Sequence, residues 1–256
     1  MSGVRLAVLY GIYPQQLGFC GPQDKSDKKT LLNFLLKKRT NQRKVREILK
    51  RFPAAYAYYR LIAKVNKIRD PFDERVVQAY WTGNELLDKV SSKALKEMVE
   101  RDFSRPGLLK KKETQELAER IPQGAPPHHS FHVYFVGSIT GRVKLNDKLR
   151  DLCRISWGKI KENSKFQIPN SKQIPNSKKQ ISKLLIEYQL IIRKSNKFIL
   201  TEAIEKEIIW DKRLVPEVKE GDWVAIHWNH LIEILKQKDL ANLKKYTEKT
   251  IKLVNG

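Results

Sequence analysis

The pattern of apolar residues changes near residue 145, from helical spacing to short β-rich runs. This change is the feature of the sequence that most limits how the chain can fold. Between about 27 and 121, apolar residues recur at helical spacing, as in "VREILKRFPAAYAYYRLIAKVN". After the Pro/Gly-rich "IPQGAPPHHSFHVYFVG", short β-rich runs alternate with turns, from "RISWGKI" to "DWVAIHW". The chain is long enough for two small domains. We therefore predict an α+β protein with an all-α domain over residues 1–145 and a small β-barrel over residues 146–256.

Local signals predict where several elements begin and end. Pro53 should interrupt the helical pattern, and Asp70 should cap a helix that has Pro71 in its first turn. The serine of "SSKALKEMVERDF" should cap the next helix. In the second domain, "KFILTEAI" and "EIIWD" are expected as separate β-rich runs. The whole of "HLIEILKQKDLANLKKYTEKTIKLVN" is expected as one C-terminal amphipathic helix.

One segment fits neither domain. Residues 167–178 are a tandem hexapeptide, "QIPNSKQIPNSK", with too little apolar content to join a core. We predict a low-complexity insertion at 163–180, in the loop of a β-hairpin, where added length costs little entropy.

The net charge of +23 raises the question of a nucleic-acid partner. Much of the excess lies in "KKRTNQRKVREILKR" and in the lysine-rich 154–197. No helix-turn-helix, zinc-finger or RNP-type pattern accompanies this charge. We therefore interpret "KKRTNQRKVREILKR" first as an amphipathic helix whose basic face is exposed to solvent. Nucleic-acid binding, with the barrel as an OB-like platform, stays as an alternative.

Two cysteines give no disulfide framework, and "MSGVRLAVLYGIYP" lacks the features of a signal peptide. No apolar run reaches the roughly 18 to 20 residues that a membrane-spanning helix needs. We expect a cytoplasmic protein with no membrane partner.

Three of the five histidines, His128, His129 and His132, lie together in "PPHHSFHVY". If this stretch is helical, His128 and His132 lie one turn apart and could share a metal ion; if it is extended, they do not. Cys20, in the turn-rich "LGFCGP", could add a soft sulfur ligand. The competing interpretation is a hydrogen-bonded loop that packs two domains together, with Cys20 simply buried.

The usual hydrolase, kinase and dehydrogenase signatures are absent from the sequence. A metal-dependent enzyme built on Cys20, His128 and His132 is kept as a second alternative.

The second domain resembles the small hydrogenase assembly chaperones of the HypC/HupF family. The resemblance lies in "CRISWGKI", in "LVPEVKEGDWVAIHWNHLIEIL" and in the terminal helix. The positions that match the family's pattern are Cys153, Gly158, Lys159, Gly221, Asp222 and His227. The resemblance implies a HypC-like barrel in which Cys153 is a strand-end thiol and Cys153, Gly158, Lys159 and His227 belong to a cofactor site.

The resemblance also implies a function in [NiFe]-hydrogenase metallocentre maturation, as a binding or accessory protein rather than an enzyme. The cofactor would be iron carrying cyanide and carbon monoxide, and the partner a hydrogenase large-subunit precursor or another maturation protein. The family's cysteine becomes N-terminal and carries a free amine, whereas Cys153 is internal. We therefore expect another ligand, from Cys20 or the histidine cluster, to take the place of that amine.

The chain as a whole also resembles an uncharacterised bacterial and archaeal family. The motifs that carry this resemblance are "YPQQLGFCGP", "AYWTGNELLD" and "PHHSFHVY". It implies a shared architecture and adds no chemistry.

Overall fold

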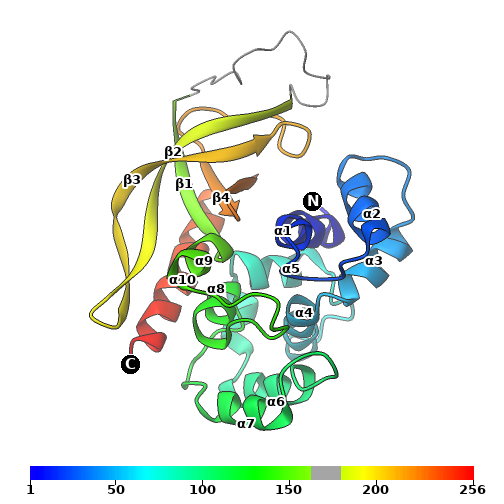
Figure 1. Cartoon of the computed structure of the whole chain (residues 1–256), viewed down its shortest axis with the longest axis vertical. Coiled ribbons are helices and arrows are strands. Elements are labelled where there is room, and N and C mark those ends of the chain that lie inside the picture. The colour runs from blue at the N-terminus through cyan, green and yellow to red at the C-terminus, as the bar shows by residue number, and fades with distance from the viewer. Residues whose placement is uncertain (163–179) are drawn as a thin grey trace.

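The structure is a computed structural model that describes residues 1–162 and 180–256. A group of helices occupies one side of the molecule and a β-barrel the other, with the last helix, α10, running along the barrel (Figure 1). The helices that precede the barrel are α1 (Gly3–Gln16), α2 (Lys25–Leu35), α3 (Gln42–Lys50), α4 (Pro53–Val65), α5 (Glu74–Trp81), the 3₁₀ helix η1 (Glu85–Lys89), α6 (Ser92–Asp102), α7 (Lys111–Glu119), α8 (His129–Phe131), the π-helical turn η2 (His132–Val136) and α9 (Asp147–Cys153).

Two of the predicted helix signals, Pro53 and the serine cap, are found in the structure, and those at Asp70 and Pro71 are not, because α5 begins at Glu74. Helix α3 ends before Pro53, which is the first residue of α4, and the Ser91 hydroxyl accepts a hydrogen bond from the Ala94 N–H to cap α6. The prediction for Asp70 is wrong, because the cap of α5 is Asp73, which accepts from the Arg75 N–H. Asp70 instead accepts from the Phe72 N–H, so it closes a turn just before the helix.

Five strands form a closed barrel in the order β1-β2-β3-β5-β4. All neighbours are antiparallel except β3 and β5, which pair in parallel at Ile209 and His230. The strands are β1 (Ser156–Glu162), β2 (Ile181–Lys194), β3 (Lys197–Asp211), β4 (Trp223–His227) and β5 (His230–Ile234), and α10 (Gln237–Val254) follows them. The predicted α+β class, with helices, a barrel and a C-terminal helix, is therefore confirmed. Apart from Gln180, the insertion predicted at 163–180 lies outside the described residues.

Two predictions about the barrel are wrong. The runs "KFILTEAI" and "EIIWD" form one continuous strand, β3, because both pair with the long strand β2. The first five residues of the predicted C-terminal helix form β5, and the helix begins only at Gln237. Trp228 and Asn229, with φ of 50° and 65°, make a tight two-residue turn that folds β5 back onto β4.

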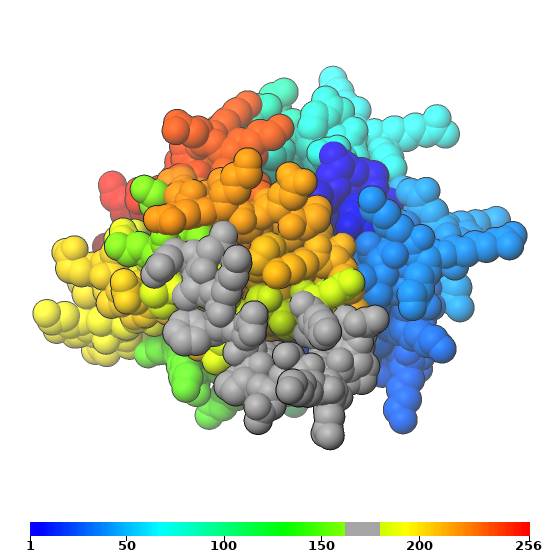
Figure 2. Space-filling view, turned by 90° about the horizontal axis from the view of Figure 1, so that it is seen from above, coloured from blue at the N-terminus to red at the C-terminus, as the bar shows by residue number. Residues whose placement is uncertain are grey.

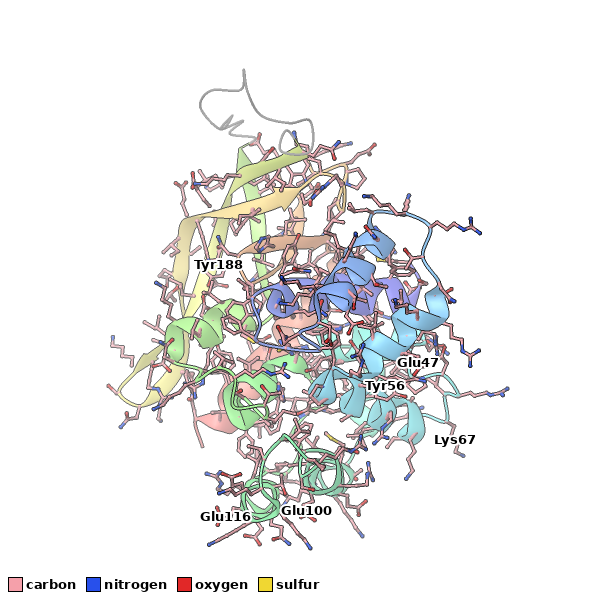
Figure 3. The ribbon with its side chains drawn as sticks, turned by 45° about the vertical axis from the view of Figure 1, so that its right-hand side comes forward. Glu47, Tyr56, Lys67, Glu100, Glu116 and Tyr188 are labelled. Carbon is pink, nitrogen blue, oxygen red and sulfur yellow. The ribbon has the colours of Figure 1, made fainter. Side chains whose placement is uncertain are left out.

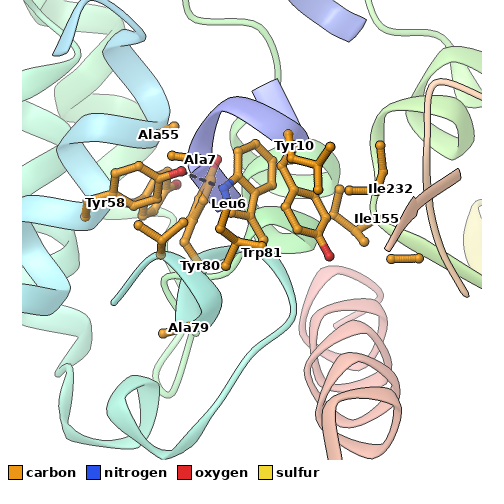
Figure 4. Close-up of a cluster of buried hydrophobic side chains, with 14 of the residues drawn as sticks. Leu6, Ala7, Tyr10, Ala55, Tyr58, Ala79, Tyr80, Trp81, Ile155 and Ile232 are labelled. Atoms are coloured by element: carbon orange, nitrogen blue, oxygen red, sulfur yellow. Dashed lines mark hydrogen bonds between the residues drawn. The ribbon is translucent and has the colours of Figure 1, made fainter. Parts of the chain in front are cut away.

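The helices and the barrel share a continuous apolar core. On the helical side it contains an aromatic cluster in which Tyr10 stacks on Trp81 with ring centroids 5.1 Å apart. Ile155 and Ile232 come from the barrel side and lie next to Tyr10 (Figure 4). From above, the N-terminal helices lie against the barrel strands (Figure 2). No helix in the described ranges is both long and apolar enough to cross a lipid bilayer.

Gly83 shows how tightly α10 is held against the helices. Its φ is +88°, and a Cβ at this position would overlap the ring of Tyr246 in α10. The Tyr246 hydroxyl donates to the backbone oxygen of Asn84 at 2.9 Å. The glycine of "AYWTGNELLD" is thus required both by its backbone conformation and by the packing of a distant aromatic ring.

We predict that Gly83→Ala lowers the free energy of unfolding by at least about 2 kcal/mol, because it adds overpacking to left-handed backbone strain. The measurement is equilibrium denaturation in urea. The control is Gly124→Ala, since Gly124 has φ +79° but open space where its Cβ would lie. Equal losses in the two variants would show that the contact with Tyr246 contributes nothing.

Candidate metal centre

Three metal-ligating side chains from distant parts of the chain meet at the junction of helices and barrel. One ligand atom from each of His129, Cys153 and His227 lies within 4.8 Å of the other two, and all three residues are buried. Each comes from the end of a different element: His129 begins α8, Cys153 ends α9 and His227 ends β4. This is the only such group of three or more potential ligands in the residues that the structure describes.

Backbone contacts hold Cys153 beside the end of β4. Cys153 lies at the end of a helix, so its expected place at a strand end is wrong. Asn146 caps α9 by accepting from the Leu149 N–H, and the Trp228 N–H donates to the Leu152 oxygen at 2.8 Å. This last bond ties the end of α9 to the β4–β5 turn and so places the thiol near His227.

His129 is held through both ring nitrogens. Nε2 donates to the backbone oxygen of Cys153 at 2.8 Å, which leaves Nδ1 to accept from the Tyr80 hydroxyl at 3.0 Å. Because one N–H and one lone pair satisfy these contacts, the ring is neutral. A metal ion at Nδ1 would take the place of the Tyr80 hydrogen bond, while the Nε2–H bond would continue to orient the ring.

His227 has one nitrogen engaged and one without a partner. Nδ1 donates to the backbone oxygen of Tyr10, in α1, at 2.7 Å. Nε2 is buried and has no hydrogen-bond partner among the described residues, although the side chain lines a cavity at the site. A buried nitrogen lone pair without a partner is costly unless something else binds it.

Burial sets the protonation states of all three groups. It lowers the pKa of His227 to about 4 and holds the pKa of His129 well below its usual value. It also raises the pKa of the Cys153 thiol well above its usual value. At neutral pH the site therefore presents two neutral imidazoles and a thiol whose proton a bound cation would displace.

The cavity at this site has a volume of about 70 Å³ and mostly apolar walls. Phe19, Trp81 and Trp228 line it together with the three candidate ligands. It can hold a small ligand beside the thiol and exclude most water.

The structure brings several of the candidate ligands from the sequence analysis to one cavity, including residues expected to supply a further ligand beside Cys153. Cys20 and His132 line the same cavity as Cys153 and His227. The His128–His132 stretch is helical, but the predicted pair does not converge, because His128 is an extended N-cap residue with φ −111° and ψ 151°. Its ring stacks on Tyr246, with centroids 5.7 Å apart, and His129 occupies the site instead.

Two residues carried over from the chaperone resemblance lie outside the cavity. Lys159 is exposed on β1. Gly158 serves packing, since a Cβ there would lie 2.7 Å from Cδ1 of Ile186 inside the barrel. Neither residue is among those that line the cavity or form the three-ligand group.

The sequence analysis missed the two tyrosines that orient the histidines. Tyr80 contacts His129 through its hydroxyl, and Tyr10 contacts His227 through its backbone oxygen. Tyr80 lies within "AYWTGNELLD", so the motif did mark it. The contact of Tyr10 uses its backbone oxygen, which every residue type carries, so the sequence could not indicate it.

The chain belongs to a family of unknown function, DUF6390, whose model matches residues 1–256. The comparison with curated proteins and the comparison with solved structures found no match. The family match covers both the helices and the barrel, so the site at their junction lies within the matched region.

Glu233 in β5 allows a test of how α1 is held at the site. It accepts a hydrogen bond from the Tyr10 hydroxyl at 2.6 Å, and burial raises its pKa to about 7. The folded state therefore binds this proton more tightly than the unfolded state, whose pKa is near 4.5. The free energy of unfolding of the wild type should therefore fall as the pH rises from 4.5 to 7. The fall should be at most about 1.4 kcal/mol per pH unit, and smaller where solvent reaches the carboxyl and screens it.

We predict that Glu233→Gln removes this pH dependence, because the amide oxygen still accepts from Tyr10 and carries no charge. The melting temperatures of variant and wild type should differ little at pH 4.5 and should diverge in favour of the variant by pH 7.5. A difference that is constant across this range would contradict the prediction.

Proposed function

We propose that the protein is an accessory factor that holds a transition-metal fragment at Cys153, His129 and His227 during assembly of a metallocentre. The observation that carries the proposal is the meeting of these three buried side chains, with an unpartnered nitrogen on His227. One thiolate and two imidazoles form a donor set typical of iron, copper, nickel or zinc.

The spacing of the ligand atoms suits such an ion. Bonds of about 2.0–2.3 Å to sulfur and nitrogen place tetrahedral ligands about 3.3–3.8 Å apart. The ligand atoms of the three side chains now lie up to 4.8 Å apart. Small side-chain rotations would bring them within the tetrahedral range. Three protein ligands would leave positions open for exogenous ligands or a partner's residue.

The resemblance to the HypC/HupF chaperones suggests which metallocentre is assembled. Cys153 and His227 are two of the positions carried over from that family, and their ligand atoms lie within 4.8 Å of each other. His129 supplies a nitrogen beside the thiol, which the family obtains from an α-amine. On this basis we propose a role in [NiFe]-hydrogenase maturation, with iron bearing cyanide and carbon monoxide as cargo and a large-subunit precursor or another maturation protein as partner.

The size of the cavity favours a carrier over an enzyme. About 70 Å³ accommodates a metal ion with diatomic ligands and excludes a larger organic substrate. The alternative of a metal-dependent enzyme with Cys20, His128 and His132 is less well supported, because the ring of His128 stacks on Tyr246 and is not among the residues that line the cavity.

We predict that the protein, purified anaerobically from its native host, contains one metal ion per chain. Cys153→Ser and His227→Gln should each reduce the metal content at least tenfold, because each removes a ligand that the other two cannot replace. Metal analysis gives the stoichiometry, and infrared spectroscopy detects iron-bound carbon monoxide and cyanide.

The matched controls are Cys20→Ser and His230→Gln. Cys20 lines the cavity without belonging to the three-ligand group, and the ring of His230 stacks on Tyr13. Both variants should keep the metal. Metal that survives in Cys153→Ser and is lost in Cys20→Ser would refute the proposed site and favour the enzyme alternative.

A further inference from the structure

A second cavity lies beside the metal centre and has a different chemical character. It is a cleft of about 420 Å³ between the α3–α4 junction, the segment after α6 and the Thr140–Arg142 segment. Tyr56 and Glu47, labelled in Figure 3, locate this side of the molecule. Pro53 and Thr140 line both cavities, so the cleft is adjacent to the chamber that contains Cys153.

Five cationic side chains and one acidic side chain line this cleft. The cations are Lys50, Arg51, Arg60, Arg105 and Arg142, and the acid is Asp102. Lys50 and Arg51 are neutralised from outside the cleft, by Glu47 and by Asp27. The remaining three arginines decide the charge of the cleft.

Asp102 is almost completely buried and neutralises only one of the arginines that converge on it. Arg60 and Arg105 contact one of its oxygens at 2.5 and 2.6 Å, and Arg101 contacts the other at 2.7 Å. Three cations on one carboxylate leave an excess of two positive charges. One carboxylate offsets only part of the repulsion among three guanidinium groups, so a second anion would be attracted to them.

Arg142 adds a further positive charge. Its guanidinium donates to the backbone oxygen of Gly21 at 2.6 Å, and it has no carboxylate partner among the described residues. With Arg60, Arg105 and Asp102 it gives the lining of the cleft an excess of two positive charges, because Arg101 is not among the residues that line it. The bond to Gly21 also fixes the direction of Arg142 at the cleft wall.

We propose that this cleft binds the phosphate group of a small molecule. Guanidinium groups recognise phosphate oxygens through paired N–H donors, and Arg60, Arg105 and Arg142 line the cleft from three different segments of the chain. Tyr56 also lines the cleft, and its ring lies under the Arg60 guanidinium at 5.8 Å. The volume falls in the range of small-molecule sites. This inference does not depend on metal binding at Cys153.

The test is isothermal titration of the full-length protein with inorganic pyrophosphate, with citrate as a polycarboxylate of similar size. We expect one pyrophosphate site per chain and weaker binding of citrate. Arg105→Gln and Arg142→Gln should each weaken the binding at least tenfold. Arg120→Gln removes the same charge from the exposed end of α7 and should change the affinity less than twofold.

Two further measurements separate this proposal from the others. The Cys153→Ser variant should bind pyrophosphate as the wild type does, so the loss of the metal site would leave the cleft intact.

Equal weakening in all three arginine variants, an absence of saturation, or tighter binding of citrate would overturn the proposal. It would also be overturned if a single-stranded RNA displaced pyrophosphate with a steep dependence on salt, because that result would indicate an extended nucleic-acid surface.

Discussion

The hydrogen bond from His227 to the backbone oxygen of Tyr10 is the contact on which the rest of the site depends. It joins the last residue of β4 to the middle of α1, two elements more than 200 residues apart in the chain. The same tyrosine stacks on Trp81 and donates its hydroxyl to Glu233. One residue of α1 thus fixes a histidine tautomer, a strand of the barrel and the central aromatic cluster. Any ligand at Nε2 of His227 therefore binds to a ring that is already oriented.

The site lies where helices and barrel meet, and neither part could build it alone. The barrel supplies His227, the helices supply His129, and α9 brings Cys153 to both. The apolar core runs from the helices into the barrel, and a second apolar cluster contains Cys153 and Trp228, so the three buried ligands are held by the packing of the whole fold. The adjoining arginine cleft is built differently, around one buried carboxylate on the outer side of the helices.

The predictions from sequence succeeded where a signal is local. Helical periodicity, Pro53 and the Ser91 cap predicted helices that the structure contains, because these signals act within one or two turns. They failed where two local structures suit the same residues. The segment from His230 to Ile234 has apolar residues at spacings that suit a helix, but the turn at Trp228 and Asn229 pairs it with β4. Strand pairing, a nonlocal interaction, decided the outcome.

The sequence by itself determined the α+β class, the starts of α4 and α6 and the kinds of residue from which a metal site could be built. Only the tertiary structure decided which of these residues meet. It placed His129 beside Cys153 and His227 and turned His128 towards Tyr246, although these two histidines are neighbours in the sequence. The physical reason is that consecutive side chains point in different directions at the start of a helix, and the contacts of His129 with the Tyr80 hydroxyl and the Cys153 backbone oxygen hold its ring in the site.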